Sequence, residues 1–514
     1  MRIAVLIYAG SLDDRALQGL AGGPSAYERV LEFARALPDL AGGLVLEAGP
    51  PLPEGAFPRL RRESWTDLEV LEEARRFCAG LPEPVEALVL VRADEPLLDA
   101  DLTRRMLANY RRYRAEYCFA DGYPLGLAPE IVHPRILPAL AALAAASPLP
   151  PKRGWLFTVL QRDINSFDIE TEISPRDLRD RRLTLACDSK RNVLLLERLM
   201  EAGVRGADTA LEIIPARSDL LRTLPAFVAV QVSGGCPQAC ALCPWPAAGG
   251  DILSRRDFFP LPRFGALMEG LELFAGDAVV DLSLWGEPSL HPDFPALVDA
   301  VLARPGLSLI VETSGLGWKA GLLEPLAARH RDRIDWIVSL DAATPELYGK
   351  LRGEGWSAAQ ACVERLLALW PGRVHPQLVR SRENEEELET FFRGWKAKAG
   401  NVIIQKYSRF GGRLPELKVA DLSPLERRPC WHLLRDLDVL LDGSLVPCRE
   451  MLDPKEGPGS LFEGLGPGEA GDASHYAAAL ARLWKAGEGR HLAHVAGQYP
   501  PPCGDCDEYH TFNA

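Results

Sequence analysis

Short apolar runs alternate with helical patterns along most of this 514-residue chain, and this alternation constrains the fold more than any other feature. In the first 205 residues, runs typical of buried strands lie at Ile3–Tyr8, Leu44–Glu47 and Ala87–Val91. Helical patterns lie between them at Ala26–Leu37 and Leu68–Cys78. Alternation of this kind predicts a mostly parallel sheet with helices on its faces. We therefore expect residues 1–205 to form an α/β domain.

From Phe227 the alternation resumes at a more regular spacing. Strands are expected at Phe227–Val232, Ala278–Leu284, Ser308–Glu312, Trp336–Leu340, Gln377–Arg380 and Val402–Gln405. Helical patterns separate them around Leu261–Phe274, Asp293–Leu302, Trp356–Leu369 and Glu385–Lys398. Six strand–helix units predict a partial, TIM-type (β/α)6 barrel over residues 226–420, with its functional residues at the carboxyl ends of the strands.

Two further segments complete the expected organisation of the chain. Residues 206–225 show few apolar periodicities and are expected to be a linker. Residues 421–514 contain short strand signals and a loop rich in glycine and proline at 454–472. We expect this small cysteine-rich extension to be too rich in loops to bury a large core, so that a bound metal group would stabilise it.

Charge and hydropathy exclude two classes of partner. The net charge is −13, with 71 acidic and 58 basic side chains, which disfavours binding to nucleic acid. No apolar run approaches the roughly 20 residues that span a bilayer. The apolar N-terminus lacks a clear signal-peptide cleavage site, so a first buried strand is expected there. We therefore expect a cytoplasmic protein that binds neither nucleic acid nor a membrane.

The eleven cysteines point to metal or redox chemistry. An odd number in a long, apparently cytoplasmic chain argues against a framework of disulfides. Four of them, Cys78, Cys118, Cys187 and Cys362, are isolated and are expected to be small buried apolar residues. The other seven lie in two sets.

The first set is Cys236-Pro-Gln-Ala-Cys240-Ala-Leu-Cys243, in a loop that follows a strand. Three thiolates cannot fill the four positions of a structural zinc site, and no histidine or aspartate follows within the loop. A 4Fe–4S cluster also needs four ligands, so three cysteines would leave one iron open. Zinc or coincidence is the alternative interpretation.

On this motif the chain resembles the radical S-adenosylmethionine (SAM) superfamily. The resemblance implies that Cys236, Cys240 and Cys243 are catalytic ligands of a 4Fe–4S cluster whose open iron chelates SAM. One electron then cleaves SAM to a 5′-deoxyadenosyl radical, which abstracts hydrogen from a substrate. The resemblance also implies an electron donor such as a flavodoxin or ferredoxin. The substrate, a peptide or another small molecule that is sugar-like or nucleotide-linked, is not identified by it.

The segment Trp285-Gly286-Glu287-Pro288 follows the second expected strand of the barrel. It resembles the family's Gly-Gly-Glu motif, with Trp285 in place of the first glycine. The resemblance implies that Gly286 and Glu287 bind the ammonium group of SAM, for which hydrogen-bond acceptors are suited.

Polar residues follow the next strands as well. By resemblance, Thr313, Ser314, Ser339 and Asp341 would contact the ribose and methionine parts of SAM. Arg380, after the fifth strand, is a candidate for binding the SAM carboxylate in bidentate fashion. Without the resemblance, Ser339 and Asp341 are equally well explained as helix caps, and Arg380 as a surface residue.

The second cysteine set comprises Cys430, Cys448, Cys503 and Cys506. The first two flank a hairpin with an Asp-Gly turn, a pattern similar to that of SPASM extensions of radical SAM enzymes. Since a full SPASM extension has more cysteines, the resemblance implies one auxiliary 4Fe–4S cluster, as in the shorter "twitch" variant. A structural zinc ion is the alternative.

The N-terminal domain carries a weaker resemblance. Asp94, in Val91-Arg-Ala-Asp94-Glu-Pro-Leu97, matches a motif of nucleotidyltransferases with the GT-A fold, including spore-coat polysaccharide cytidylyltransferases. The resemblance implies that Asp94 and Asp188 bind a divalent metal, which prefers oxygen ligands. The family's basic loop is replaced here by residues 9–14, which include two aspartates that would repel a triphosphate. We therefore expect a retained fold with lost transferase activity.

The order of these three parts, 1–205, 226–420 and 421–514, is similar to that of the spiro-SPASM proteins. The main hypothesis is a radical SAM enzyme with one auxiliary cluster. Two alternatives remain open: a nucleotidyltransferase that acts through its N-terminal domain, and a non-catalytic iron–sulfur or zinc scaffold.

Overall fold

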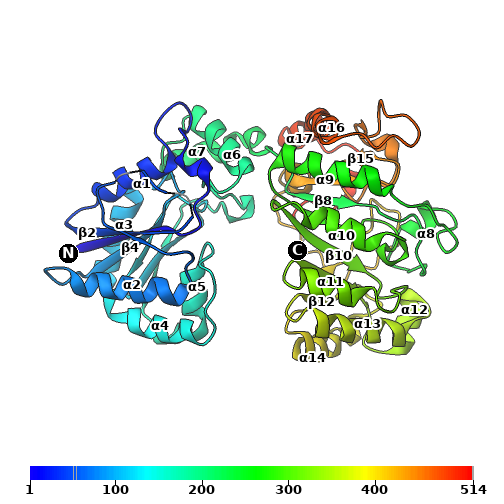
Figure 1. The fold of residues 1–514 in the computed structure, drawn as a ribbon, viewed down its shortest axis with the longest axis horizontal. Coiled ribbons are helices and arrows are strands. Elements are labelled where there is room, and N and C mark those ends of the chain that lie inside the picture. The colour runs from blue at the N-terminus through cyan, green and yellow to red at the C-terminus, as the bar shows by residue number, and fades with distance from the viewer. Residues whose placement is uncertain (50, 54, 512–514) are drawn as a thin grey trace. The chain divides into compact units, whose positions relative to one another are not determined.

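The computed structural model describes residues 1–49, 51–53 and 55–511. The chain folds into two compact units, Met1–Leu220 and Leu221–Ala514 (Figure 1). The segment 206–225 differs from the expected linker because it contains helix α7 (Ala207–Ala216), which buries Ala210 and Ile214. The first backbone N–H of this helix donates to Asp99 Oδ2 at 2.7 Å, so α7 is anchored within the first unit.

The first unit contains a seven-stranded mixed sheet in the order β3-β2-β1-β4-β6-β5-β7. The strands are β1 (Ile3–Ala9), β2 (Leu40–Glu47), β3 (Arg59–Arg61), β4 (Ala87–Arg92), β5 (Tyr117–Asp121), β6 (Glu130–Val132) and β7 (Ile169–Ile173). Strand β6 runs antiparallel to its neighbours, and the other pairs are parallel. The helices are α1 (Ala26–Arg35), α2 (Asp67–Gly80), α3 (Ala100–Tyr113), α4 (Leu137–Ala145), α5 (Trp155–Leu160), α6 (Lys190–Glu201) and α7. All of the strands and helices predicted here are confirmed.

The second unit contains a nine-stranded sheet in the order β13-β12-β11-β10-β9-β8-β14-β15-β16. Its first six strands are parallel and follow one another in chain order: β8 (Phe227–Val230), β9 (Ala278–Asp281), β10 (Leu307–Thr313), β11 (Ile334–Ser339), β12 (Val374–Arg380) and β13 (Ile403–Lys406). These are the six predicted strands. Because all six run in the same direction, their carboxyl ends meet at one edge of the sheet.

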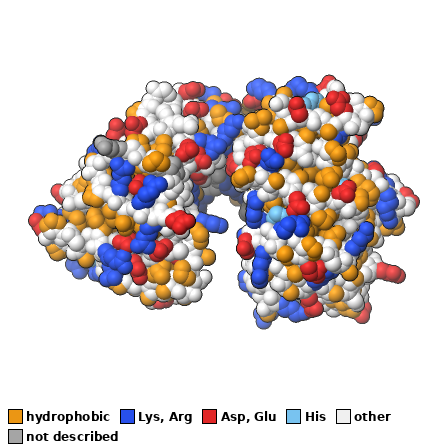
Figure 2. All heavy atoms as spheres, viewed as in Figure 1, with side chains coloured by type: hydrophobic (Ala, Val, Ile, Leu, Met, Phe, Trp, Pro, Cys, Tyr) orange, Lys and Arg blue, Asp and Glu red, His pale blue; other side chains and the backbone are white. Residues whose placement is uncertain are grey.

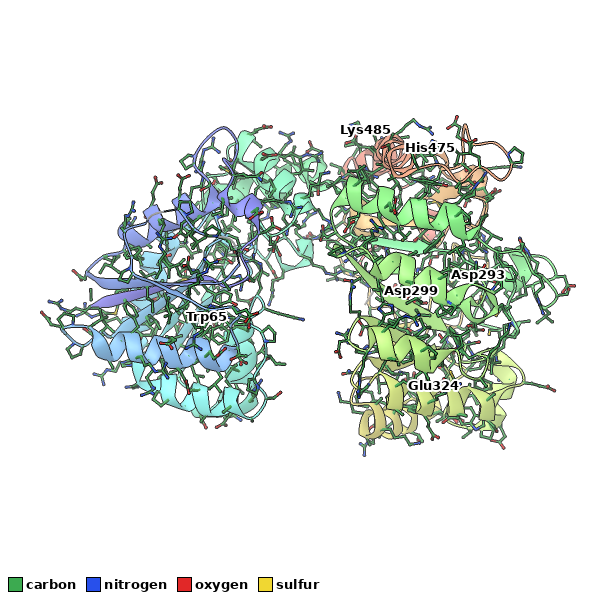
Figure 3. The ribbon with its side chains drawn as sticks, in the orientation of Figure 1. Trp65, Asp293, Asp299, Glu324, His475 and Lys485 are labelled. Atoms are coloured by element: carbon green, nitrogen blue, oxygen red, sulfur yellow. The ribbon has the colours of Figure 1, made fainter. Side chains whose placement is uncertain are left out.

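Helices connect these strands over the outer surface of the unit (Figure 1). They are α8 (Trp245–Ala248), α9 (Leu261–Ala275), α10 (Phe294–Leu302), α11 (Leu323–His330), α12 (Pro345–Arg352), α13 (Trp356–Leu369) and α14 (Leu388–Ala399). The sequence predicted α9, α10, α13 and α14 but not α8, α11 and α12. Ion pairs join neighbouring helices, such as Asp299 to Arg329 and Glu324 to Arg365. Figure 3 labels the two carboxylates, Asp299 on α10 and Glu324 on α11.

The C-terminal segment is more highly structured than expected. Strand β14 (Asp436–Val439) pairs in parallel with β8, and β15 (Ser444–Val446) and β16 (Gly459–Ser460) extend the sheet further. Helices α15 (Trp431–Arg435), α16 (Ala473–Ala486) and α17 (Glu488–Val495) complete it. The expectation of a loop-rich extension with little core was wrong, because Leu480 and Leu483 of α16 lie in the same buried cluster as Leu267 and Leu271 of α9.

The surface carries charges of both signs. Figure 2 shows basic and acidic side chains interspersed over the visible face of each unit. Within the described parts of the chain, every helix is too short or too polar to cross a bilayer.

Candidate functional site

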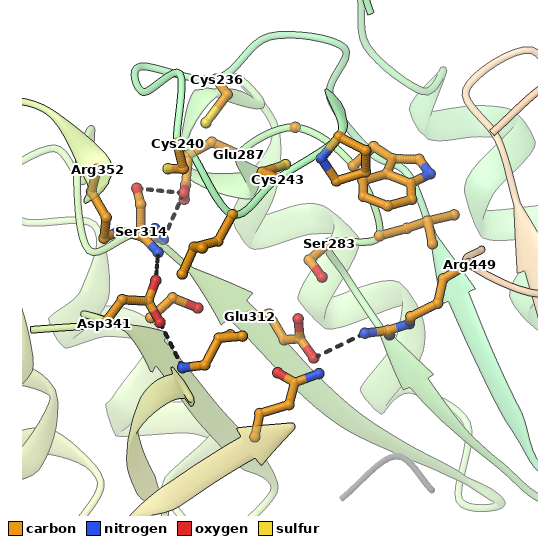
Figure 4. A pocket seen from close by; sticks show the side chains of 18 of the residues that line it. Cys236, Cys240, Cys243, Ser283, Glu287, Glu312, Ser314, Asp341, Arg352 and Arg449 are labelled. Atoms are coloured by element: carbon orange, nitrogen blue, oxygen red, sulfur yellow. Dashed lines mark hydrogen bonds and ion pairs between the residues drawn. The ribbon is translucent and has the colours of Figure 1, made fainter. Parts of the chain in front are cut away.

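A cavity of about 200 Å³ lies at the carboxyl ends of the parallel strands of the second unit (Figure 4). The loop that carries the first cysteine set follows β8 and forms one side of it. Nine of the predicted site residues line this cavity: Cys236, Cys240, Cys243, Gly286, Glu287, Thr313, Ser314, Ser339 and Asp341. These nine residues come from the carboxyl ends of four neighbouring strands, β8, β9, β10 and β11, which thus contribute to one site, as a parallel sheet allows.

The three thiols of the cysteine loop are held in a desolvated environment. Burial raises the pKa of Cys236, Cys240 and Cys243, for Cys243 to about 12. Each thiol therefore keeps its proton unless a cation binds the thiolate in its place. The loop supplies three soft sulfur ligands beside an open cavity, and this donor set fits an iron–sulfur cluster with one iron free of protein ligands.

Glu287 connects two strand ends at the wall of the cavity. Its carboxylate accepts hydrogen bonds from Thr313 Oγ1 at 2.6 Å, from Ser314 N at 2.8 Å and from Ser314 Oγ at 2.7 Å. Burial raises its pKa, and these hydrogen bonds oppose that effect. Glu287 therefore fixes the loop after β10 in place.

Gly286 is required by a close approach of two backbone segments. Its φ is +85°, and a Cβ atom there would lie 2.0 Å from the carbonyl oxygen of Ser233. The neighbouring Glu287 N–H donates to Gly235 O at 2.8 Å. Together these contacts join the segment after β9 to the backbone that leads into the cysteine loop.

Arg352, at the end of α12, was not predicted as a site residue. Its guanidinium is paired with Asp341, which also accepts a hydrogen bond from Val379 N at 2.8 Å. The positive charge of Arg352 opposes the effect of burial on the pKa of Cys240. A signal for α12 was present in Thr344-Pro345, an N-cap residue followed by proline at the first helical position.

Arg380, predicted to bind the SAM carboxylate, is not among the residues that line this cavity. Its Nε donates to Glu385 Oε2 at 2.7 Å, and its Nη2 donates to the other carboxylate oxygen. Arg380 Nε and Nη2 are thus engaged by Glu385, five residues further along the chain, in an ion pair that is half-exposed.

The opposite wall of the cavity includes residues that sequence reasoning missed. Arg449, from the C-terminal segment, lies 3.9 Å from Glu312 (Figure 4). It also lies 3.6 Å from Asp281. Lys406, at the end of β13, donates to the carbonyl oxygen of Asp507 at 2.9 Å. The C-terminal segment is therefore part of the cavity wall.

The second cysteine set gathers around a separate small cavity of about 20 Å³. Cys430, Cys448, Cys503 and Cys506 all line it, together with His432 and His494. Burial raises the pKa of Cys430 to about 12 and raises those of Cys448 and Cys506 as well. Among the residues that the structure describes, no three His, Cys, Asp or Glu side chains are grouped as ligands of a single metal ion.

Aromatic rings pack in one cluster with members of both cysteine sets. Trp245 and Trp285 are stacked with centroids 6.1 Å apart, and Phe410 contacts Trp285 edge-on at 5.6 Å. These rings belong to one apolar cluster that also contains Cys448 and Cys503 and contacts Cys236 and Cys243. The two sets are thus connected by packed side chains. The four isolated cysteines are buried elsewhere, as predicted.

In the first unit, the predicted metal ligands Asp94 and Asp188 bind an arginine instead. Arg153 lies 2.6 Å from Asp94 Oδ2 and 3.1 Å from Asp188 Oδ2. Because the guanidinium already occupies the space between these carboxylates, the residues do not fit a divalent metal ion there. The structure therefore does not support the predicted metal site at Asp94 and Asp188.

No family model matches the chain. A protein of Treponema pallidum (strain Nichols) described as "Uncharacterized protein" is 35% identical over 374 residues, which cover 70% of this chain and 98% of that protein. A second protein of that organism, described in the same words, is 35% identical over 133 residues, or 23% of this chain and 61% of its own length.

Three solved structures are also similar. A cytidylyltransferase from Leptospira borgpetersenii has 16% identity and a TM-score of 0.35, covering 43% of this chain and 95% of that one. Streptococcus suis SuiB has 14% identity and a TM-score of 0.40, covering 61% and 80%. The protein anSMEcpe with bound AdoMet has 12% identity and a TM-score of 0.36, covering 53% and 100%. Because the match covers 98% of the first Treponema pallidum protein and 70% of this chain, the chain belongs to the same family as that protein.

Proposed function

We propose that this chain is a radical SAM enzyme that reductively cleaves S-adenosylmethionine and abstracts hydrogen from a peptide or a sugar- or nucleotide-linked substrate. The observation that carries the proposal is the cavity in which Cys236, Cys240 and Cys243 meet hydrogen-bonding groups from the following strand ends. When bound, a 4Fe–4S cluster supplies the electron that cleaves SAM to a 5′-deoxyadenosyl radical. The residues of the chain bind and orient the reactants around it.

In this proposal the ammonium group of SAM is bound by main-chain carbonyls of the Trp285–Glu287 segment. Carbonyl oxygens are acceptors and suit a donor with three N–H groups. The Glu287 carboxylate is engaged by Thr313 and Ser314, so its role is to hold that segment and the loop after β10 in register.

Arg352 replaces Arg380 as the residue proposed to bind the SAM carboxylate. It lines the cavity, and its buried Nε lacks a hydrogen-bond partner within the described residues. A guanidinium with a free N–H can donate to a carboxylate while its pairing with Asp341 fixes its orientation.

The second cysteine set is proposed to hold an auxiliary 4Fe–4S cluster. Four thiols complete the ligand set and leave no open iron, so the role of this cluster would be electron transfer or structure. The stacked pair Trp245 and Trp285 lies in the apolar cluster that contains or contacts cysteines of both sets. A flavodoxin or ferredoxin is proposed as the external electron donor.

The test is the formation of 5′-deoxyadenosine. The protein is reconstituted with iron and sulfide under anaerobic conditions and then supplied with SAM and dithionite. We expect 5′-deoxyadenosine from the wild type and from Cys362→Ala, which removes a buried cysteine of α13 outside the cavity. We expect none from Cys240→Ala. If wild type and Cys240→Ala give the same result, the proposal is wrong.

Metal analysis of the same samples separates the auxiliary cluster from zinc. Two 4Fe–4S clusters correspond to about eight irons per chain and no zinc. About four irons with one zinc would refute the auxiliary cluster and leave the SAM-binding cluster unaffected.

A further inference from the structure

The first unit has a cavity of its own, and nothing in the proposed radical chemistry uses it. This cavity of about 270 Å³ lies beside the ends of β4 and β5. Arg153 and Glu95 contribute charged groups to its wall, and Tyr117, Phe119 and Phe157 contribute aromatic rings.

Arg153 is the centre of a cluster of three carboxylates. Its Nη2 lies 2.6 Å from Asp94 Oδ2 and 3.1 Å from Asp188 Oδ2, and its Nη1 lies 2.6 Å from Glu95 Oε1. The side chain of Arg153 is only 18% exposed, and that of Asp94 is 4% exposed. Two of these distances are typical of strong, charge-assisted hydrogen bonds.

A second arginine adds to the positive charge at this point. Arg92 Nε lies 3.7 Å from Asp94 Oδ1, and Arg92 lines the same cavity. The carboxylates are thus compensated by two guanidinium groups that belong to the chain. Convergent carboxylate oxygens are the ligands of hard divalent cations, but a divalent ion could enter here only by displacing the buried Arg153 side chain.

We propose that Arg153 is a built-in cation, and that the first unit binds an organic ligand in this cavity without a divalent metal ion. Because both arginines are already paired with carboxylates, the cavity does not provide the free positive charge that a metal–triphosphate chain requires. The ligand has a ring with hydroxyl or amino groups and no phosphate chain.

The chemistry of the cavity wall defines this class of ligand. Tyr117 and Phe119 are stacked at 5.6 Å, and Phe157 lies 5.2 Å from Phe119, so their rings form a continuous apolar wall. Glu130, also in the wall, uses Oε1 to accept a hydrogen bond from Tyr117 Oη. Carboxylate oxygens such as those of Glu95 and Glu130 accept hydrogen bonds. A ring with donor groups on its edge satisfies both features.

The first test measures Mn²⁺ binding to the full-length chain by electron paramagnetic resonance. As a single substitution, Asp94→Asn is expected to bind Mn²⁺ as the wild type does. Arg153→Met removes the guanidinium and is expected to create a new Mn²⁺ site. This variant should bind Mn²⁺ at least about tenfold more tightly than the wild type does. The double variant Arg153→Met/Asp188→Asn is expected to lose it.

Two control variants accompany this experiment. Arg153→Lys keeps a positive charge among the carboxylates and is expected to behave like the wild type. Arg135→Met removes an exposed arginine that pairs with the single carboxylate of Glu116, and no new site is expected. Circular dichroism establishes whether each variant is folded.

Two results would overturn the proposal that Arg153 acts as a built-in cation. One is Mn²⁺ binding by the wild type that Asp94→Asn abolishes. The other is a folded Arg153→Met that gains no site. If Arg153→Met does not fold, the comparison of wild type with Asp94→Asn still decides the question, since unchanged binding supports the proposal and reduced binding refutes it.

The ligand class is tested by saturation-transfer NMR with two probes that lack phosphate, adenosine and methyl glucoside. A signal from at least one probe, reduced in Phe157→Ala, is expected, and the probe that binds distinguishes a nucleobase-like from a sugar-like ligand. Absence of both signals would refute the ligand class. Neither test requires iron, SAM or reductant, so its outcome does not depend on the proposed radical SAM function.

Discussion

The buried pair of Asp341 and Arg352 provides a quantitative test of how the candidate site is built. Asp341 is 2% exposed, and the Arg352 side chain is 10% exposed. Arg352→Met removes the cation but retains most of the side-chain volume. Asp341 then keeps its hydrogen bond from Val379 N but loses its ionic partner.

The expected loss of stability follows from this burial. Breaking a buried ion pair by removing one partner costs about 3–5 kcal/mol, because the other charge remains without compensation. For a unit of this size, such a loss corresponds to a decrease in the unfolding midpoint on the order of 10 °C. Asp341→Asn should cost a similar amount. In the double variant neither charge is left alone, so its loss should be smaller than the sum of the two single losses by about 2 kcal/mol or more.

The assay is thermal unfolding of the apoprotein under reducing conditions, followed by tryptophan fluorescence. Only Trp65 and Trp155 of the eleven tryptophans precede residue 221, so the signal reports mainly on the second unit. The matched control is Arg365→Met, which breaks a more exposed pair with Glu324 and should shift the midpoint far less. Additive losses in the Asp341 and Arg352 variants, or a loss no larger than that of the control, would refute the reasoning.

Three further predictions concern single positions. Gly286→Ala should destabilise the second unit by about 2 kcal/mol or more in thermal unfolding, because its positive φ and the nearby Ser233 carbonyl leave no room for a Cβ atom. The control is Gly394→Ala, in the open middle of α14, which should be neutral or stabilising. Burial and then the charge of Asp94 raise the pKa of Glu95 to about 7, although Arg153 opposes them. The folded state therefore binds the Glu95 proton more tightly than the unfolded state, and stability present below pH 4.5 is lost as the pH rises through 7. The free energy of unfolding, measured across this range, should fall with pH, and Glu95→Gln should reduce that slope. An unchanged slope in Glu95→Gln would contradict the assignment. Cys430→Ala should lower the iron content of the reconstituted protein from about eight to about four atoms per chain while 5′-deoxyadenosine still forms; an unchanged iron content would exclude Cys430 as a ligand.

The strands were predictable because each is a short apolar run between polar segments. β1 is buried at all seven positions, and its sequence shows this directly. Helix α16 was not predicted because a loop rich in glycine and proline precedes it, although Tyr476, Leu480 and Leu483 have the spacing of a buried helix face. The helical spacing of apolar residues is therefore present in the sequence of α16, next to a loop whose composition favours irregular structure.

The partners of charged residues were harder to predict than the strands. Asp94 and Asp188 were expected to bind a metal, but their partner is Arg153, which is separated from Asp94 by 59 residues in sequence. Arg352 joined the site in the same way, through a helix that the sequence analysis missed. A single sequence shows which residues are ionisable, but only the fold determines which opposite charges become neighbours once they are buried.

The C-terminal segment is better regarded as part of the second unit than as an appended module. Asp281, at the end of β9, has no exposed surface, and burial raises its pKa well above the ordinary value while Arg449 opposes this. Arg449 reaches Asp281 because β14 pairs with β8 and because β15, which precedes Arg449 in the chain, pairs with β14. Without the C-terminal segment, β8 would be an uncovered edge strand, and Asp281 would lose its closest cation. The pairing that brings Arg449 to the cavity wall also places Cys448 in the second cysteine set, so the wall of one site and the ligands of the other depend on the same few strands.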